Sequence, residues 1–146
     1  MKIRNLVLVA GLAMTATLSA GIALPAFAQD APVSASAEAQ GQSFFKKKYK
    51  IKGSWSLVQR DGKTFVKFSE DFKTKNGPDL KIFLSPKSES DVNGKNALEG
   101  SLNLGALKNK KGPQEYEIPV GTDLSLYSTV LIHCEAYAIL WGGGAL

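Results

Sequence analysis

The sequence contains one cysteine and one histidine, and the two residues are adjacent, at Cys134 and His133. Thiolate and imidazole groups ligate transition metals and redox cofactors, and a thiolate also exchanges with disulfides. Consecutive residues of a regular strand point to opposite faces, so these side chains converge on one ion only through a β-bulge. We therefore take Cys134 as the candidate catalytic residue and Cys134 and His133 as candidate cofactor contacts. We predict no metal site built by this chain alone, and the identity of any cofactor stays open.

The rest of the composition excludes most familiar redox and hydrolytic sites. A single Cys rules out an intramolecular disulfide, a Cys-x-x-Cys motif, a zinc knuckle, an iron–sulfur cluster and covalently bound c-type haem. A blue-copper centre needs two His and one Cys. Asp123, Ser125 and His133 are the residue types of a hydrolase triad, but the sequence has no Gly-x-Ser-x-Gly turn to present the serine. We expect a non-enzymatic protein.

Residues 1–28 have the composition of a secretory signal peptide. Lys2 and Arg4 precede an apolar run that Pro25 ends, and Ala26-Phe27-Ala28 forms a small-x-small cleavage site. Cleavage near Ala28 removes two of the 18 basic residues and leaves 16 against 13 acidic ones. The residue directly after the cleavage site is Gln29 and not a Cys, so lipid attachment is not indicated. We predict a periplasmic or secreted protein with a modest positive charge.

The mature chain is predicted to begin with a linker. Residues 29–43 are rich in Ala, Ser and Gln and contain no aromatic residue, which is typical of flexible segments. The domain spans residues 44–146 and opens on a basic run, Lys46 to Lys48 followed by Lys50 and Lys52. We interpret this run as the solvated face of an edge strand, with attraction of phospholipid headgroups or an acidic partner as the alternative. Because the mature chain has a small net charge and an export signal, and the run has no interleaved pattern of aromatic residues for base stacking, we predict no nucleic-acid partner.

Alternation of apolar and polar residues predicts a domain of strands. Tyr49 to Leu57 alternates with period two, and Arg60-Asp61-Gly62-Lys63 contains the Asp-Gly pair of a hairpin turn. Further strands are predicted over residues 64–72, 80–84, 102–107, 114–118 and 128–140, the last of them central. Residues 85–100 are polar and predict a surface loop. Residues 142–144 predict either a frayed end or a place where backbone packs closely.

These elements define the predicted fold class. One helical turn is predicted over residues 122–127, capped by Thr122 or Asp123. Short strands with frequent turn signals and no amphipathic helix predict an all-β fold, either an antiparallel β-sandwich or a small barrel. In the predicted last strand, Cys134 shares an apolar face with Val130, Ile132, Ala136 and Ala138. Such a face suits an inert, buried side chain as well as a thiol that the fold leaves reachable.

Three stretches occur in a specific order and spacing. They are Gly77-Pro78-Asp79-Leu80, then Leu104-Gly105-Ala106-Leu107-Lys108 leading to Gly112-Pro113-Gln114-Glu115-Tyr116-Glu117-Ile118-Pro119, and Leu126-Tyr127-Ser128-Thr129-Val130-Leu131-Ile132-His133-Cys134. Over about residues 50–146 the chain resembles the DM-thirteen domain family. In animals that domain accompanies DOMON and cytochrome-b-type domains and is described as a predicted electron-transfer module with a β-sandwich-like fold.

The resemblance implies roles for individual residues. Cys134 corresponds to the single characteristic Cys of the family, which is proposed to be redox-active or to contact a cofactor. His133 stands where the family more often has an aromatic residue such as Trp. Framework positions are implied at Gly77, Pro78, Asp79, Gly105, Gln114, Tyr116 and Pro119.

We therefore hypothesise an exported, non-enzymatic electron-transfer module that relies on Cys134. The thiol would act through a cofactor shared with a partner, or by reversible oxidation to a sulfenic acid or a mixed disulfide. The expected partner is an envelope redox protein or a membrane-associated protein. An alternative is a periplasmic β-sandwich that binds a protein or ligand, with Cys134 only a core residue. A third hypothesis is a dimer linked by a disulfide through Cys134.

Overall fold

The computed structural model describes residues 37–38 and 41–146, so the predicted signal peptide lies outside the described residues. The described residues belong to one unit, Pro32–Leu146. In chain order the elements are β1 (Ala37–Glu38), β2 (Gln42–Ser43), β3 (Phe45–Lys46), β4 (Ser54–Arg60), β5 (Lys63–Phe68), β6 (Leu80–Ser85), β7 (Leu102–Ala106), β8 (Gln114–Ile118), the 3-10 turn η1 (Leu124–Leu126), β9 (Thr129–Cys134), the 3-10 turn η2 (Glu135–Tyr137) and β10 (Ile139–Ala145).

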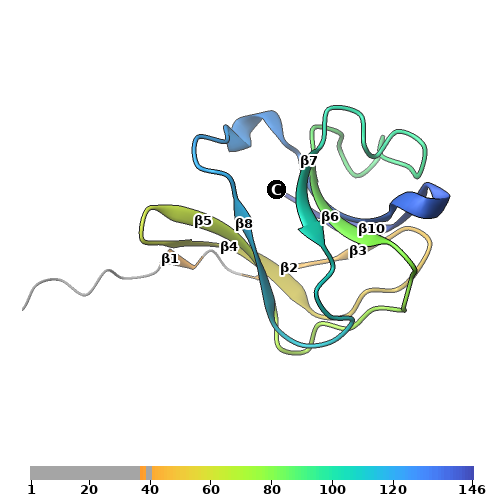
Figure 1. Cartoon of the computed structure of the whole chain (residues 1–146), viewed down its shortest axis with the longest axis horizontal. Helices are drawn as coiled ribbons and strands as arrows, with labels where there is room; N and C mark the ends of the chain where they lie inside the picture. The colour runs from red at the N-terminus through yellow and green to blue at the C-terminus, as the bar shows by residue number, and fades with distance from the viewer. Residues whose placement is uncertain (1–36, 39–40) are drawn as a thin grey trace, which may run out of the picture. The chain divides into compact units, whose positions relative to one another are not determined.

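Two antiparallel sheets make up the domain (Figure 1). The first has the order β1-β4-β5-β8, with β2 also paired to β4, and the second has the order β3-β10-β9-β6-β7. Neither sheet closes on itself in the described part of the chain, so the fold is an all-β sandwich rather than a barrel. Within the same residues, no helix is long and apolar enough to cross a membrane.

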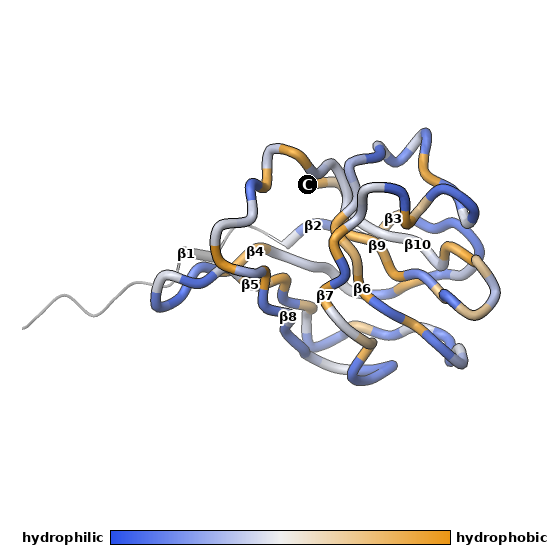
Figure 2. Tube along the Cα trace, turned by 45° about the horizontal axis from the view of Figure 1, so that its top comes forward, coloured by the Kyte–Doolittle hydropathy of each residue, from blue (hydrophilic) through white to orange (hydrophobic). Residues whose placement is uncertain are grey.

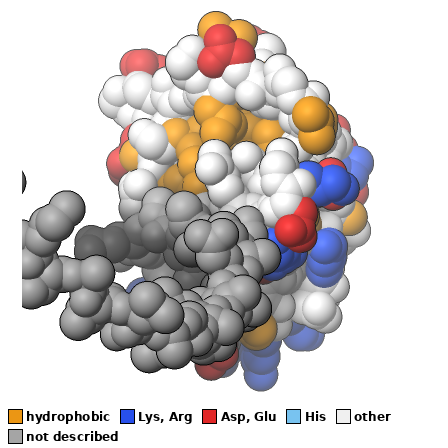
Figure 3. All heavy atoms as spheres, turned by 90° about the vertical axis from the view of Figure 1, so that its left-hand side faces the viewer, with side chains coloured by type: hydrophobic (Ala, Val, Ile, Leu, Met, Phe, Trp, Pro, Cys, Tyr) orange, Lys and Arg blue, Asp and Glu red, His pale blue; other side chains and the backbone are white. Residues whose placement is uncertain are grey.

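The main core lies between the two sheets, where alternate strand residues point inward. The first sheet contributes Trp55, Val66, Phe68, Tyr116 and Ile118, and the second contributes Leu80, Ile82, Leu84, Val130, Ile132 and Cys134. Figure 2 shows the apolar stretches along β6 and β9 and the polar stretches at the turns. Further hydrophobic side chains gather on the end of the domain that faces left in Figure 1 (Figure 3).

A second, smaller core covers the outer face of the β6–β9–β10 sheet. Residues 85–100, predicted to be a surface loop, fold over this face and bury Val92 and Ala97 against Phe83 and Leu131. The segment is a loop, as predicted, and the burial of these two side chains was not indicated because an isolated apolar residue in a polar stretch gives no periodic signal. The loop matters for the site because it also covers His133.

Local turn chemistry agrees with the sequence at two places. Asp61 and Gly62 have φ values of +52° and +72°, the positive pair that a type I′ hairpin turn requires. Asp123 caps η1, and its side chain accepts a hydrogen bond from the backbone N–H of Ser125 at 3.0 Å.

Two predicted strands have different boundaries in the structure. The strand predicted over residues 49–57 begins only at Ser54, because Gly53 has a φ of +88° that a regular strand excludes. The strand predicted over residues 128–140 is a hairpin of β9 and β10. Ala138 has a φ of +50°, which reverses the chain after η2 and leaves Ala136 and Ala138 exposed on the turn instead of beside Cys134. β9 itself is central in its sheet, as predicted.

Both ends of the domain pair into sheets. β1 and β2, which fall within the predicted linker, pair with β4. The glycines Gly142–Gly144 lie in β10, where a Cβ at Gly144 would overlap the indole of Trp55 and one at Gly143 would overlap the carbonyl oxygen of Val130. Close backbone packing, rather than fraying, therefore explains this glycine run.

Candidate functional site

Cys134 is the last residue of the central strand β9 and points into the main core. Its side chain has no exposed surface. The residues directly opposite it are Leu80 on β6 and Ile139 on β10. Side chains of directly opposed residues lie on the same face about 4.5–5.5 Å apart, so Leu80 and Ile139 flank the thiol.

His133 points to the opposite face of the same sheet, as strand alternation predicts. It is fully buried beneath residues 85–100, with Nε2 3.0 Å from the carbonyl oxygen of Gly94 and the ring edge-on to Phe83. The register shift of this hairpin lies between Leu140 and Gly142, and the ladder pairs at Cys134 and His133 are regular. The structure therefore does not bring the thiol and the imidazole together.

A cavity of about 370 Å³ lies next to Leu80, the register partner of Cys134. It is lined by residues 76–80 before and at the start of β6 and by residues 106–110 after β7. These segments contain Gly77-Pro78-Asp79-Leu80 and the end of Leu104-Gly105-Ala106-Leu107-Lys108. Leu80 lines this cavity and is also the direct neighbour of Cys134.

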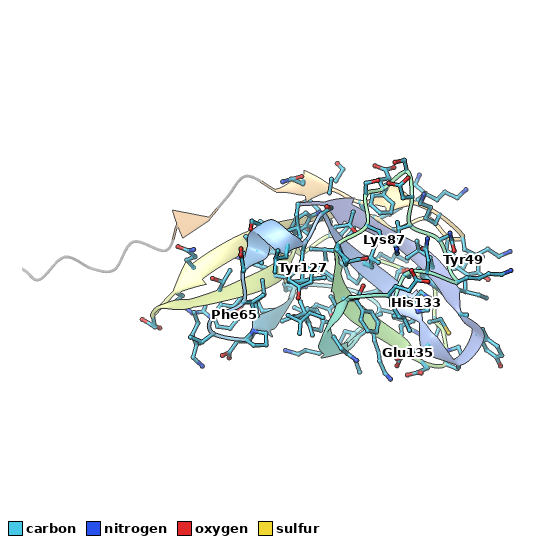
Figure 4. All side chains as sticks on the ribbon, turned by 90° about the horizontal axis from the view of Figure 1, so that it is seen from above. Tyr49, Phe65, Lys87, Tyr127, His133 and Glu135 are labelled. Atoms are coloured by element: carbon cyan, nitrogen blue, oxygen red, sulfur yellow. The ribbon has the colours of Figure 1, made fainter. Side chains whose placement is uncertain are left out.

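A charged group ties the η2 turn to the start of β6. Lys81 pairs with Glu135 and lies 3.5 Å from Asp79, and the backbone N–H of Glu135 donates to the carbonyl oxygen of Asp79 at 3.1 Å. The hydrogen bond to Glu135 is the main cause that raises the pKa of Lys81. Figure 4 places Glu135 and His133 at one end of the sandwich, away from Phe65. The turn that follows Cys134 is therefore anchored to the segment that lines the cavity.

A buried hydrogen-bond network holds the other wall of the cavity. The Tyr116 hydroxyl accepts from the backbone N–H of Lys108 at 3.0 Å and donates to Gln114 Oε1 at 2.7 Å. The Gln114 side chain in turn bonds both the N–H and the carbonyl oxygen of Asn109. Burial raises the pKa of Tyr116 to about 12, so the phenol stays a donor at neutral pH. Sequence reasoning treated Gln114 and Tyr116 only as framework and had no signal for this network.

Ile139, the other neighbour of Cys134, lines a second recess of about 510 Å³. The remaining lining comes mostly from the covering loop, Ser90 to Gly94, and from Ala138 and Leu140. Among the described residues, no three His, Cys, Asp or Glu side chains lie close enough together to hold a metal ion.

The fold and this site define a small antiparallel β-sandwich with a single interior thiol at the end of its central strand. Residues 43–143 match the family described as electron transfer DM13, and the chain belongs to this family. The resemblance seen in the sequence is thus confirmed. Neither a curated protein nor a solved structure matches the chain. The family description supports an electron-transfer module as the general function.

Proposed function

We propose that this chain is an exported, non-enzymatic electron-transfer module that relies on the thiol of Cys134. The observation that carries the proposal is the double position of Leu80, which lines the 370 Å³ cavity and lies directly opposite Cys134. A displacement of this one side chain and the adjoining η2 turn gives a redox partner access to the sulfur. The buried resting position protects the thiol between encounters.

The electron-transfer step is thiol–disulfide exchange. The Cys134 thiolate attacks the disulfide of an oxidised partner, forms a mixed disulfide and releases one partner sulfur as a thiolate. A reduced dithiol partner then attacks the Cys134 sulfur, which frees the first partner as a dithiol. The second thiol of the new partner closes its own disulfide and returns Cys134 as a thiol. Two electrons pass from one partner to the other, and the protons are exchanged with solvent.

Export is the second part of the proposal. A basic start, an apolar run and the Ala26-Phe27-Ala28 sequence support cleavage near Ala28 and release into the periplasm or the medium. Dithiol and disulfide partners are available in that compartment, where thiol oxidation is favoured. The proposed partner is accordingly a redox protein of the cell envelope. Mass analysis of the N-terminus of exported protein tests this part.

A second candidate function rests on the burial of the thiol. Zero exposure and contact with the core suit a side chain that only packs, as in a β-sandwich module that binds a protein or ligand. In that case the folded protein would carry an unreactive sulfur. Replacing Cys134 by Ala would then change stability without changing partner binding.

Reaction of the folded protein with a small aromatic disulfide distinguishes the two functions. The proposal expects release of one reagent thiolate per chain under conditions where the protein stays folded, with none from the Cys134→Ala variant. The rate should exceed the rate set by global unfolding, which is measured in parallel by hydrogen exchange. A thiol that reacts only as fast as the chain unfolds would contradict thiol reliance and leave the binding module.

A further inference from the structure

A cluster of six lysines lies next to the cavity that Leu80 lines. We call it the lysine face; it consists of Lys50, Lys52, Lys73, Lys75, Lys110 and Lys111. Isolated antiparallel bridges join Lys52 to Lys73 and Lys73 to Lys111, and all three side chains are exposed. Residues opposite each other in such bridges project to the same side, so the side chains of Lys52, Lys73 and Lys111 lie side by side. The arrangement is repulsive in the free protein and attractive to an anion.

The lysine face has no internal counter-charge. In the described part of the chain, none of its six ammonium groups pairs with a carboxylate, and Lys75 instead lies 5.2 Å from the ring centre of Tyr49. Elsewhere Lys63 pairs with Glu117 at 2.9 Å and Lys87 with Glu99 at 3.0 Å. The basic residues predicted to form a solvated edge thus continue into a surface built from three separate chain segments.

A small recess that Thr74 helps to line lies within the lysine face. It has a volume of about 150 Å³ and is lined by Thr74 and by Lys50, Lys52, Lys73 and Lys75. Thr74 is only 7% exposed, and its hydroxyl has no hydrogen-bond partner among the described residues. Buried hydroxyls are normally paired, so this one points to a missing acceptor. The volume is below that of drug-sized ligand pockets and suits one carboxylate group.

The lysine face adjoins the cavity that Leu80 lines. The backbone N–H of Thr74 donates to the carbonyl oxygen of Lys110 at 3.0 Å, and Lys110 also lines the 370 Å³ cavity. Leu80 lines that same cavity. A molecule seated on the lysine face therefore lies next to the cavity from which, in the proposed function, a partner reaches Cys134 by displacing Leu80.

We propose that the lysine face is the docking surface for an acidic protein partner, with one partner carboxylate in the Thr74 recess. This inference rests on the proposed function and names the charge of its partner. Electrostatic steering of this kind speeds short-lived encounters between redox proteins. A membrane surface is disfavoured because the large exposed hydrophobics of the described chain, Leu98, Val120, Leu126 and Tyr137, are not in the lysine face. Stable membrane binding would need such side chains or a lipid anchor beside the charge.

Titration of the mature protein with a glutamate-rich peptide, followed by amide NMR spectra, tests the proposal. Shifts are expected at Lys52, Thr74 and Lys111, and they should weaken as salt increases. Replacing Lys52, Lys73 and Lys111 by Gln should weaken peptide binding by about tenfold, as expected for three modest charge contacts. Thr74→Val, which keeps the side-chain shape, should weaken binding about fivefold and leave the lysines in place.

The matched control replaces Lys63, Lys87 and Lys95 by Gln, which changes the net charge equally. Binding of the peptide should change less than about twofold in this control. Equal weakening in both triple variants, or shifts elsewhere on the surface, would overturn the proposal. Tighter binding to phosphatidylglycerol vesicles than to the peptide, lost with the same three lysines, would also overturn it in favour of a membrane. Since peptide binding transfers no electrons, the Cys134→Ala protein should bind equally, which separates this test from that of the thiol.

Discussion

Leu80 and Cys134 are register partners across β6 and β9, and Leu80 is 7% exposed whereas Cys134 has no exposed surface. In the proposed function, Leu80 is the side chain that a partner displaces to reach the sulfur from the cavity. Because Gly77 packs against the side chains of both Leu80 and Trp141, the segment before β6 holds this leucine in place. The segment Gly77-Pro78-Asp79-Leu80 thus fixes the leucine that flanks the thiol.

Replacing Leu80 by Ala should make Cys134 more reactive toward a small aromatic disulfide. The truncation removes the flanking side chain and costs about 2–5 kcal/mol of stability, as for other buried leucines. The matched control is Leu84→Ala, a similar truncation on the same face of β6, where the register partner is Val130. We expect the Leu80 variant to react at least about tenfold faster than the control, both measured while folded.

Ile139→Ala identifies the side from which reagents reach the sulfur. Ile139 flanks Cys134 from β10 and lines the recess on the other side. If this variant accelerated the thiol reaction and Leu80→Ala did not, the route through the 370 Å³ cavity would be wrong.

The polarity around Cys134 can be read from two conservative variants. Cys134→Ala should lower the free energy of unfolding by about 1 kcal/mol through lost packing. Cys134→Ser should cost more, about 1–3 kcal/mol, because it places a hydroxyl without a partner in the core. Urea denaturation of both variants measures the difference. A Ser variant as stable as the Ala variant would mean that water or a polar group reaches the site in the resting fold.

A disulfide-linked dimer should form only after the domain opens. An inter-chain bridge needs Cα atoms about 4.4–6.8 Å apart, and a dimer needs the side chains that flank the sulfur, Leu80 and Ile139, to be displaced in both copies at once. Non-reducing gels should show a monomer after mild oxidation of the folded protein and a dimer after oxidation in urea. The Cys134→Ala protein should stay monomeric in both. A dimer from the folded protein would contradict the closed arrangement.

Stability at alkaline pH should depend on Tyr116. Its pKa is raised by burial to about 12 from the usual 10, so the folded state keeps a proton that the unfolded state loses. The stabilisation is complete below pH 10 and is lost as the pH rises through 12, because the unfolded state binds fewer protons in that window. Wild-type and Tyr116→Phe proteins should therefore converge in stability between pH 9 and pH 12, as measured by urea denaturation at each pH. A constant difference would show that Tyr116 ionises alike in both states.

The sequence by itself determined the features that depend on neighbouring residues. Asp61-Gly62 specifies a hairpin because its backbone takes positive φ values, and Asp123 caps η1 through a carboxylate two residues from the N–H it accepts. The opposite orientations of His133 and Cys134 also follow from alternation along a single strand. The order of three motifs was enough to indicate the family.

Only the tertiary structure decided what surrounds the thiol. Leu80 lies more than fifty positions before Cys134, and sheet pairing alone makes them neighbours. Three other features likewise join segments that are distant in the sequence. They are the loop that covers His133, the Tyr116–Gln114 hydrogen-bond network and the lysine face. The sequence predicted one strand over residues 128–140 and missed the end of β9. The turn after β9 depends on the left-handed backbone of Ala138, a conformation that alanine does not favour. Residue composition and the alternation of apolar and polar residues thus define strands and turns. The surroundings of a buried sulfur depend instead on which strands pair.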